Sequence, residues 1–138
     1  MRTVNRVFVY GTLRSDAKNS MHSVLAKYSK FEAKGYVYGT LYDVGEYPAI
    51  VLDSVRSKVY GEVYIVYDMD RVFGLLDEYE ECSDSFVKPH EYRRVQAEVF
   101  LDLGKRVESW VYEYNLPPKG LKPICEGDYM EYLKSRKR

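Results

Sequence analysis

Strand-like segments follow one another along most of this sequence, and helical segments seldom come between them. β-Branched and aromatic residues fill these segments, and glycine-containing turns separate several of them. The expected strands cover residues 6–10, 31–44, 49–52, 59–67, 92–103 and 106–115. A doubly wound sheet needs helices that alternate with strands, so the pattern excludes it. We expect an α+β fold, in which a small mixed β-barrel or a strongly curled sheet has about three short helices packed outside.

The expected helices are short. They cover residues 20–28, 69–81 and 128–134. Asp68 or Asp70 is the expected N-cap of the second helix, because a carboxylate there accepts hydrogen bonds from free backbone N–H groups. Glycine interrupts the expected strands at positions 35, 39 and 61, where it allows bending or close approach of another backbone. The segments 82–91 and 116–123 are expected to be loops.

The charges of the chain cancel. Its 138 residues include 21 basic and 21 acidic ones, so binding of nucleic acid or of an anionic membrane through bulk charge is not expected. No run approaches the ~18 apolar residues of a membrane span, and no signal peptide is recognised, which makes the cytoplasm the expected compartment. We expect one domain over residues 1–138, with the basic residues 134–138 as a frayed tail.

Residues that often bind metals or act as nucleophiles are sparse. His22 and His90 have no ligand partner at helical spacing, so no metal site is expected. Cys82 and Cys125 form no C-x-x-C motif, and we expect a reduced pair, with one disulfide as the open alternative. No serine elbow and no phosphate-binding glycine pattern occur.

One carboxylate stands out in the expected helix 69–81. Its apolar stripe consists of Val72, Leu75, Leu76 and Tyr79. At roughly 100° per residue, Asp77, Glu78 and Glu81 fall well away from this stripe, whereas Glu80 lies about 80° from its centre, one heptad after Phe73. Partial burial would raise the pKa of Glu80 toward the range of a general acid or base. The alternative is that Glu80 pairs with an arginine, such as Arg93 or Arg94.

The first strand ends at Gly11-Thr12-Leu13, followed by Arg14. Consecutive backbone N–H groups at such a strand end can turn toward one point and bind a carboxylate. The alternative is an ordinary turn in which the Thr12 side chain bonds its own backbone.

Six segments, in this order, together resemble the gamma-glutamylcyclotransferase-like family, which includes gamma-glutamylamine cyclotransferases and avirulence-induced plant proteins. They are VFVYGTLR at 7–14, GTLYDVGEYPA at 39–49, VYGEVY at 59–64, LDEYE at 76–80, YRR at 92–94 and GDYMEYL at 127–133. Two features depart from the family pattern. Glu81 stands where many members have glycine, and the loop 82–91 is longer than in compact members.

The resemblance implies a mixed barrel and an acyltransferase- or lyase-type enzyme that needs no cofactor. Its small-molecule γ-glutamyl substrate would be cyclised to 5-oxoproline, with release of an amine or amino acid. Glu80 is the implied catalytic residue. The implied substrate-binding residues are Tyr10, Gly11, Thr12, Leu13, Arg14, Tyr47 and Tyr92. A non-catalytic binder or sensor of small carboxylates on the same scaffold is the alternative function.

Overall fold

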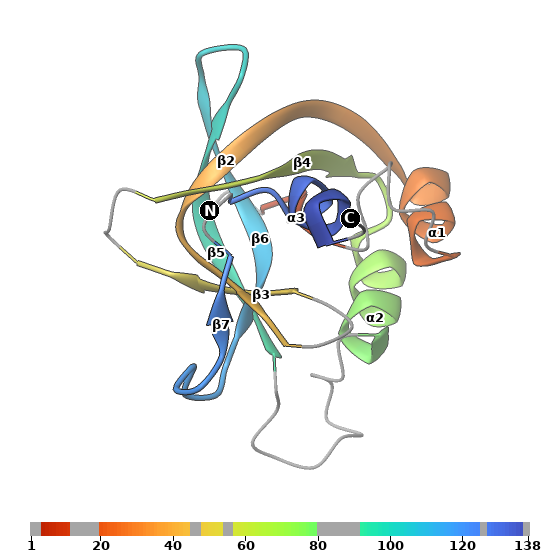
Figure 1. Ribbon diagram of the computed structural model, residues 1–138. Helices are drawn as coiled ribbons and strands as arrows, with labels where there is room; N and C mark the ends of the chain where they lie inside the picture. Colours follow the sequence, from red (N-terminus) through yellow and green to blue (C-terminus); the bar gives the residue numbers. More distant parts are fainter. Residues whose placement is uncertain are drawn as a thin grey trace.

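The computed structural model describes residues 4–11, 20–44, 48–53, 57–79, 92–124 and 127–136 (Figure 1). The described chain contains strands β1 Arg6–Val9, β2 Ser29–Asp43, β3 Pro48–Leu52, β4 Lys58–Val66, β5 Tyr92–Leu101, β6 Arg106–Tyr114 and β7 Lys122–Pro123. The helices are α1 Ser20–Tyr28, α2 Met69–Tyr79 and α3 Tyr129–Arg136. The α+β prediction is therefore confirmed.

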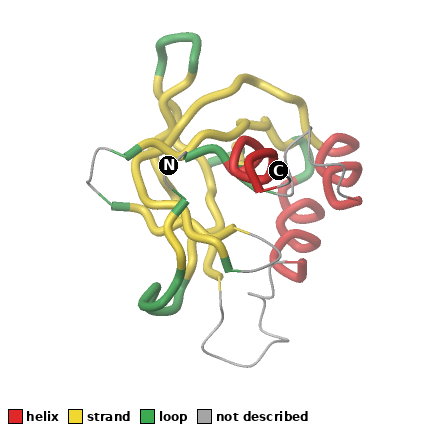
Figure 2. The backbone as a smooth tube through the Cα atoms, in the orientation of Figure 1, coloured by secondary structure: helices red, strands yellow, loops and turns green. Residues whose placement is uncertain are grey.

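Five strands close into a mixed barrel. The hydrogen-bonded order is β2-β4-β1-β6-β5, and β5 pairs back onto β2. The β1–β6 pair is parallel, and the other pairs around the barrel are antiparallel. The long β2 curves around the barrel and also pairs with β3 and β7 (Figures 1 and 2).

Two apolar clusters lie on opposite sides of the barrel wall. Phe8, Val37, Val63 and Val111 are at most 1 % exposed in the inner cluster, which Tyr129 and Tyr132 of α3 join. The outer cluster combines Val7 and Val9 of β1 with Leu25 of α1 and with Val72, Phe73 and Leu76 of α2. Both faces of β1 are thus buried, as its apolar sequence predicts. Helices α1 and α2 lie on the same flank of the barrel (Figure 1).

The strand glycines permit close approach between neighbouring backbones. A Cβ at Gly35 would lie 2.6 Å from the Phe100 carbonyl oxygen, and one at Gly39 would lie 2.6 Å from that of Val51. A Cβ at Gly61 would overlap the carbonyl oxygen of Val9. A side chain at any of these positions would push two strands apart, so the expected close approach is confirmed.

Three local predictions are wrong. Residues 122–123, expected in a loop, form β7, because the Ile124 N–H donates to the Leu41 carbonyl and holds this segment along β2. Helix α3 extends to Arg136, two residues beyond its predicted end and into the expected basic tail, with an ion pair of 3.6 Å between Lys134 and Glu131. Leu75, expected in the apolar stripe of α2, is 42 % exposed, because Phe73 takes its place against the barrel.

The N-cap of α2 is Asp68, whose Oδ1 accepts a hydrogen bond of 3.2 Å from the Arg71 N–H. The hairpin between β5 and β6 turns at Gly104, where φ is 95°, a left-handed conformation that glycine adopts easily. Within the described residues, no helix has the length and apolar character needed to span a bilayer.

Candidate active site

Three of the predicted site residues meet where β3 begins. The Tyr10 hydroxyl donates a hydrogen bond to the Tyr112 carbonyl (2.7 Å) and accepts one from the Ile50 N–H (3.3 Å). The Tyr92 hydroxyl donates to the Pro48 carbonyl (2.8 Å). Gly11 packs so closely on the Pro48 ring that a Cβ would lie 2.5 Å from Cγ. We call Tyr10, Gly11, Pro48, Ile50 and Tyr92 the β3 junction.

The β3 junction fixes backbone positions. Tyr10 and Tyr92 are 7 % and 4 % exposed, and both hydroxyls bind backbone groups of other strands. These two side chains therefore hold the C-terminal end of β1 and the N-terminal end of β5 against the start of β3. Each buried hydrogen bond of this kind contributes about 0.5–1.5 kcal/mol.

The other predicted site residues lie outside the described part of the chain. They are Thr12, Leu13, Arg14, Tyr47 and Glu80. Their chain neighbours are placed, since Gly11 precedes Thr12, Pro48 follows Tyr47, and α2 ends at Tyr79. The structure thus brings together Tyr10, Gly11 and Tyr92, and the positions of the remaining five residues stay predictions.

The last described turns of α2 are anchored beside the β3 junction. Leu76 is fully buried in the same cluster as Ala49, Tyr92 and Tyr112. Asp77, the next residue, accepts a hydrogen bond of 2.6 Å from the Tyr112 hydroxyl and two from Arg94, at 3.0 and 3.3 Å. The end of α2 is therefore fixed to β5 and β6 by packing and by charge.

Asp77 is a residue that helical periodicity missed, because it falls away from the apolar stripe. A usable signal was its spacing. It precedes Glu80 by three residues, and side chains at i and i+3 share one side of a helix. On the helix that the sequence predicts over 69–81, Asp77 and Glu80 therefore lie on the same side.

Both arginines considered as partners for Glu80 bind another carboxylate. Arg94 binds Asp77, and Arg93 donates to Glu113 Oε1 at 2.9 and 3.2 Å. Glu113 also accepts from the Leu52 N–H at 2.8 Å, which ties β3 to β5 and β6. The ion pairs of these arginines support the barrel wall, and a pair with Glu80 stays an untested alternative.

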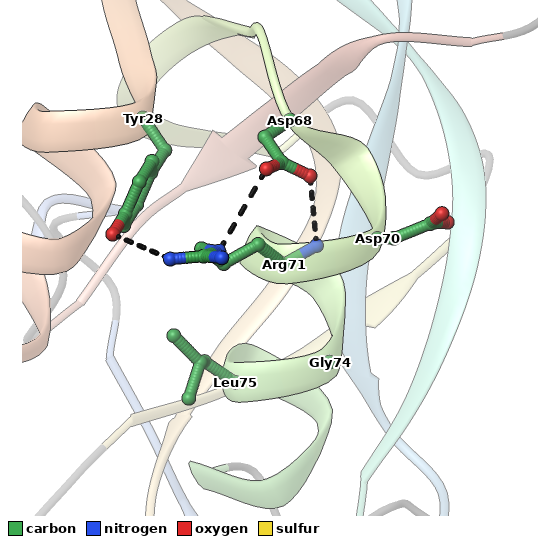
Figure 3. A pocket seen from close by; sticks show the side chains of 6 residues that line it. All are labelled: Tyr28, Asp68, Asp70, Arg71, Gly74 and Leu75. Carbon is green, nitrogen blue, oxygen red and sulfur yellow. Dashed lines mark hydrogen bonds and ion pairs between the residues drawn. The ribbon is translucent and has the colours of Figure 1, made fainter.

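An open hollow lies between α1 and α2 (Figure 3). It is lined by Tyr28, Asp68, Asp70, Arg71, Gly74 and Leu75. Arg71 donates to the Tyr28 hydroxyl at 3.0 Å, which lowers the pKa of Tyr28, and its Nε lies 3.7 Å from Asp68. Tyr10, Gly11 and Tyr92, the predicted site residues that the structure describes, do not line this hollow. The bond between Arg71 and Tyr28 holds the two helices together.

Metal ligands are not gathered in the described ranges. No group of three or more His, Cys, Asp or Glu side chains there has a geometry that could hold an ion.

The closed mixed barrel, with α1 and α2 covering one flank, is a gamma-glutamylcyclotransferase-like fold. Mouse has an AIG2-like protein with a solved structure of this fold, at a TM-score of 0.66 and 25 % identity, covering 86 % of this chain and 82 % of that protein. YkqA from Bacillus subtilis has a TM-score of 0.72 and 27 % identity over 99 % of this chain, which spans 44 % of YkqA.

Sequence comparison gives the family. Residues 7–131 match the family described as gamma-glutamyl cyclotransferase, AIG2-like. A candidate gamma-glutamylcyclotransferase of Methanocaldococcus jannaschii is 33 % identical over 132 residues, which cover 91 % of this chain and 96 % of that protein. The chain belongs to the AIG2-like gamma-glutamyl cyclotransferase family.

Proposed function

We propose that this protein is a gamma-glutamylcyclotransferase that converts a small γ-glutamyl compound into 5-oxoproline and a free amine or amino acid. One observation carries the proposal beyond family membership. The end of β1 and the start of β3 meet at the β3 junction, and α2 is anchored beside it through Leu76, which shares a buried cluster with Ala49 and Tyr92. This arrangement supports a site formed by the chain segments that adjoin Gly11, Pro48 and the last described turn of α2. The jannaschii relative, named for this activity, supports the same reaction class.

The reaction is intramolecular. The α-nitrogen of the substrate attacks its own γ-carbonyl carbon, a new C–N bond closes the lactam, and the C–N bond to the leaving group breaks. Two protons leave the α-ammonium in the course of the reaction, and the leaving nitrogen gains two, so no co-reactant is needed. Glu80 is the proposed general base and then general acid, roles typically worth ~10²–10⁴-fold in rate.

Positioning supplies much of the rate in such a reaction. A γ-glutamyl chain is flexible, and holding it with its nitrogen against its own carbonyl can contribute up to roughly 7–11 kcal/mol. We propose that backbone N–H groups of residues 11–13 bind the α-carboxylate or the developing oxyanion, with Arg14 adding positive charge. The close contact of Gly11 with Pro48 supports a fixed starting point for this segment.

The test is mass-spectrometric detection of 5-oxoproline after incubation with a panel of γ-glutamyl amines and peptides. We expect release from at least one member by the wild type, and a loss of at least about 10²-fold in Glu80→Gln. The matched control is Glu98→Gln, because Glu98 is exposed and pairs with Arg106 on the β5–β6 hairpin. Its activity should equal that of the wild type.

Three results would decide against parts of the proposal. Binding of γ-glutamyl compounds without any release across the panel would favour a non-catalytic binder of small carboxylates. Substantial activity in a folded Glu80→Gln protein would remove Glu80 from the mechanism. If the protein neither binds any member of the panel nor releases 5-oxoproline from it, γ-glutamyl compounds are not its substrate class.

A further inference from the structure

The barrel buries two carboxylates almost completely. Among the described residues, Glu62 is 2 % exposed and Glu113 is 6 % exposed. Removing a carboxylate from water costs several kcal/mol unless hydrogen bonds or opposite charges compensate. The partners of Glu113 explain its place in the wall, since it joins Arg93 to the Leu52 N–H. Glu62 is buried on another strand, β4, where it accepts a hydrogen bond from the Tyr64 hydroxyl.

Glu62 is on β4, directly opposite Val9 of β1. Directly opposed residues in neighbouring strands point to the same face of a sheet. Val9 belongs to the outer cluster that α1 and α2 cover, and so does Tyr64, two residues after Glu62 on the same face. Glu62 therefore lies on the helix-covered side of the barrel, beside the residue that leads into Tyr10 and Gly11.

A second carboxylate lies on the other side of Val9. In the parallel β1–β6 pair, Val7 is opposite Trp110, so Tyr112 falls beside Val9 on the same face. The Tyr112 hydroxyl holds Asp77 at the end of α2. Tyr112 of β6, Val9 of β1 and Glu62 of β4 thus lie side by side on the outer face of the barrel wall. Asp77, which Tyr112 binds, lies at the β6 end of this row.

The position of Glu62 is set by its neighbours. Gly61 allows β4 to approach β1 so closely that a Cβ would overlap the Val9 carbonyl oxygen. The Tyr64 hydroxyl donates a hydrogen bond of 3.0 Å to Glu62 Oε1. On its other side Glu62 is opposite Lys34 of β2, a residue exposed to solvent. The carboxylate is therefore oriented by Tyr64, on a strand position directly opposite the last residue of β1.

We propose that Glu62 binds the α-ammonium of the substrate. The inference rests on the proposed function for the choice of ligand, because γ-glutamyl compounds carry a cation at the α-carbon, next to the carboxylate that residues 11–13 would bind. A carboxylate oriented beside the end of β1 complements that cation. A charge-assisted hydrogen bond formed away from water is stronger than a neutral one and discriminates against ligands that lack the charge.

The experiment uses two ligands that differ only in the α-ammonium, L-glutamate and glutarate. Neither can lose an amine, so binding is measured without turnover, by NMR titration of the full-length ¹⁵N-labelled protein. We expect the wild type to bind L-glutamate about ten-fold or more tightly than glutarate. In Glu62→Gln the affinity for L-glutamate should fall to that for glutarate, while the affinity for glutarate is unchanged.

The matched control is Glu113→Gln, which removes the other buried carboxylate. It should lower the melting temperature and leave the ratio of the two affinities as in the wild type. Glu62→Asp, which keeps the charge but withdraws it by one methylene, should give an intermediate ratio. If Glu62→Gln does not fold, Tyr64→Phe takes its place, since it removes the hydroxyl that orients the carboxylate, and the ratio should again fall.

Equal affinities of the wild type for both ligands, or no binding of L-glutamate, would overturn the inference. So would an unchanged ratio in the folded Glu62→Gln protein, or in Tyr64→Phe where that variant replaces it. An effect on stability alone would mean that Glu62 has a structural role only. These readings are independent of 5-oxoproline release, so an active wild type with an unchanged ratio rejects the role of Glu62 and leaves the proposed function standing.

Discussion

The Tyr112 hydroxyl donates a hydrogen bond of 2.6 Å to Asp77, and this contact joins the barrel to the helix that precedes Glu80. Arg94 binds the same carboxylate from the neighbouring strand and lies with its guanidinium carbon 4.5 Å from the centre of the Phe73 ring. Helix α2 and strands β5 and β6 are therefore held together at one side chain. The last described turn of α2 is thereby fixed against the barrel wall.

We expect Asp77→Asn to lower both stability and 5-oxoproline release. The amide keeps the size of the side chain but loses the charge-assisted bonds to Arg94, at a cost of about 1.5–3 kcal/mol. Chemical denaturation of Asp77→Asn, Tyr112→Phe and the double variant measures the coupling between the two residues. Strictly additive effects on stability would show that the short contact is not energetically significant.

Asp70→Asn is the control for the change of charge, because Asp70 is exposed in the first turn of the same helix. Its effect on stability should stay within about 0.5 kcal/mol. A loss as large as that of Asp77→Asn would point to a general charge effect on α2.

Tyr92→Phe should weaken substrate binding more than it slows the chemical step. The hydroxyl donates to the Pro48 carbonyl, and its loss would leave that buried carbonyl without this donor and loosen the start of β3. We expect a loss of about 1–3 kcal/mol in stability and a raised KM for 5-oxoproline release. Tyr67→Phe is the control, because Tyr67 is 67 % exposed. If Tyr92→Phe has the stability and KM of the wild type, the hydrogen bond between Tyr92 and Pro48 does not support the site.

The local parts of the fold could be predicted from the sequence, and the long-range parts could not. Helix α1 has the predicted bounds, 20–28, because its pattern depends only on neighbouring residues. The β5–β6 hairpin likewise follows from local turn chemistry around Gly104. In contrast, β7 is a strand only because β2 passes beside it, and the shift in register between Phe31 and Ala33 depends on pairing with β4.

The same division applies to the candidate site. Family resemblance located Tyr10, Gly11 and Tyr92, and their side chains or backbone do meet at β3. Asp77 and Glu113 were not found, because their partners lie on other strands, between 17 and 61 residues away. Periodicity gives the face of a helix or strand on which a charge lies, but it cannot give the residue that faces it.

The Arg6–Glu32 pair makes a testable contribution to the pH dependence of stability. Hydrogen bonds from Arg6, at 2.6 and 3.1 Å, hold the pKa of Glu32 below its usual value. The folded state then binds the Glu32 proton less readily than the unfolded state does. The resulting stability is present above the unfolded pKa, about 4.3, and is lost as the pH falls through the folded pKa.

We expect Glu32→Gln to cost about 1–2 kcal/mol at pH 7. The difference from the wild type should shrink steadily from about pH 5 downward, because protonation of Glu32 leaves the wild type, like the variant, without a charge at this position. Urea denaturation at several pH values measures this. A difference that stays constant between pH 7 and pH 3 would show that the ion pair does not shift the titration of Glu32.

Two glycines allow a matched test of how tightly the substrate segment is held. Gly11→Ala would place a Cβ 2.5 Å from Pro48 Cγ, in a ring that cannot move aside without shifting β3. We expect a loss of about 1–3 kcal/mol in stability and a marked loss of 5-oxoproline release. Gly74→Ala adds the same methyl group where no heavy atom lies within 4 Å, in the exposed middle of α2, and should stabilise the protein by about 0.5–1 kcal/mol. Wild-type activity in Gly11→Ala would mean that the contact with Pro48 does not position the segment that follows, and the β3 junction would lose its role in the site.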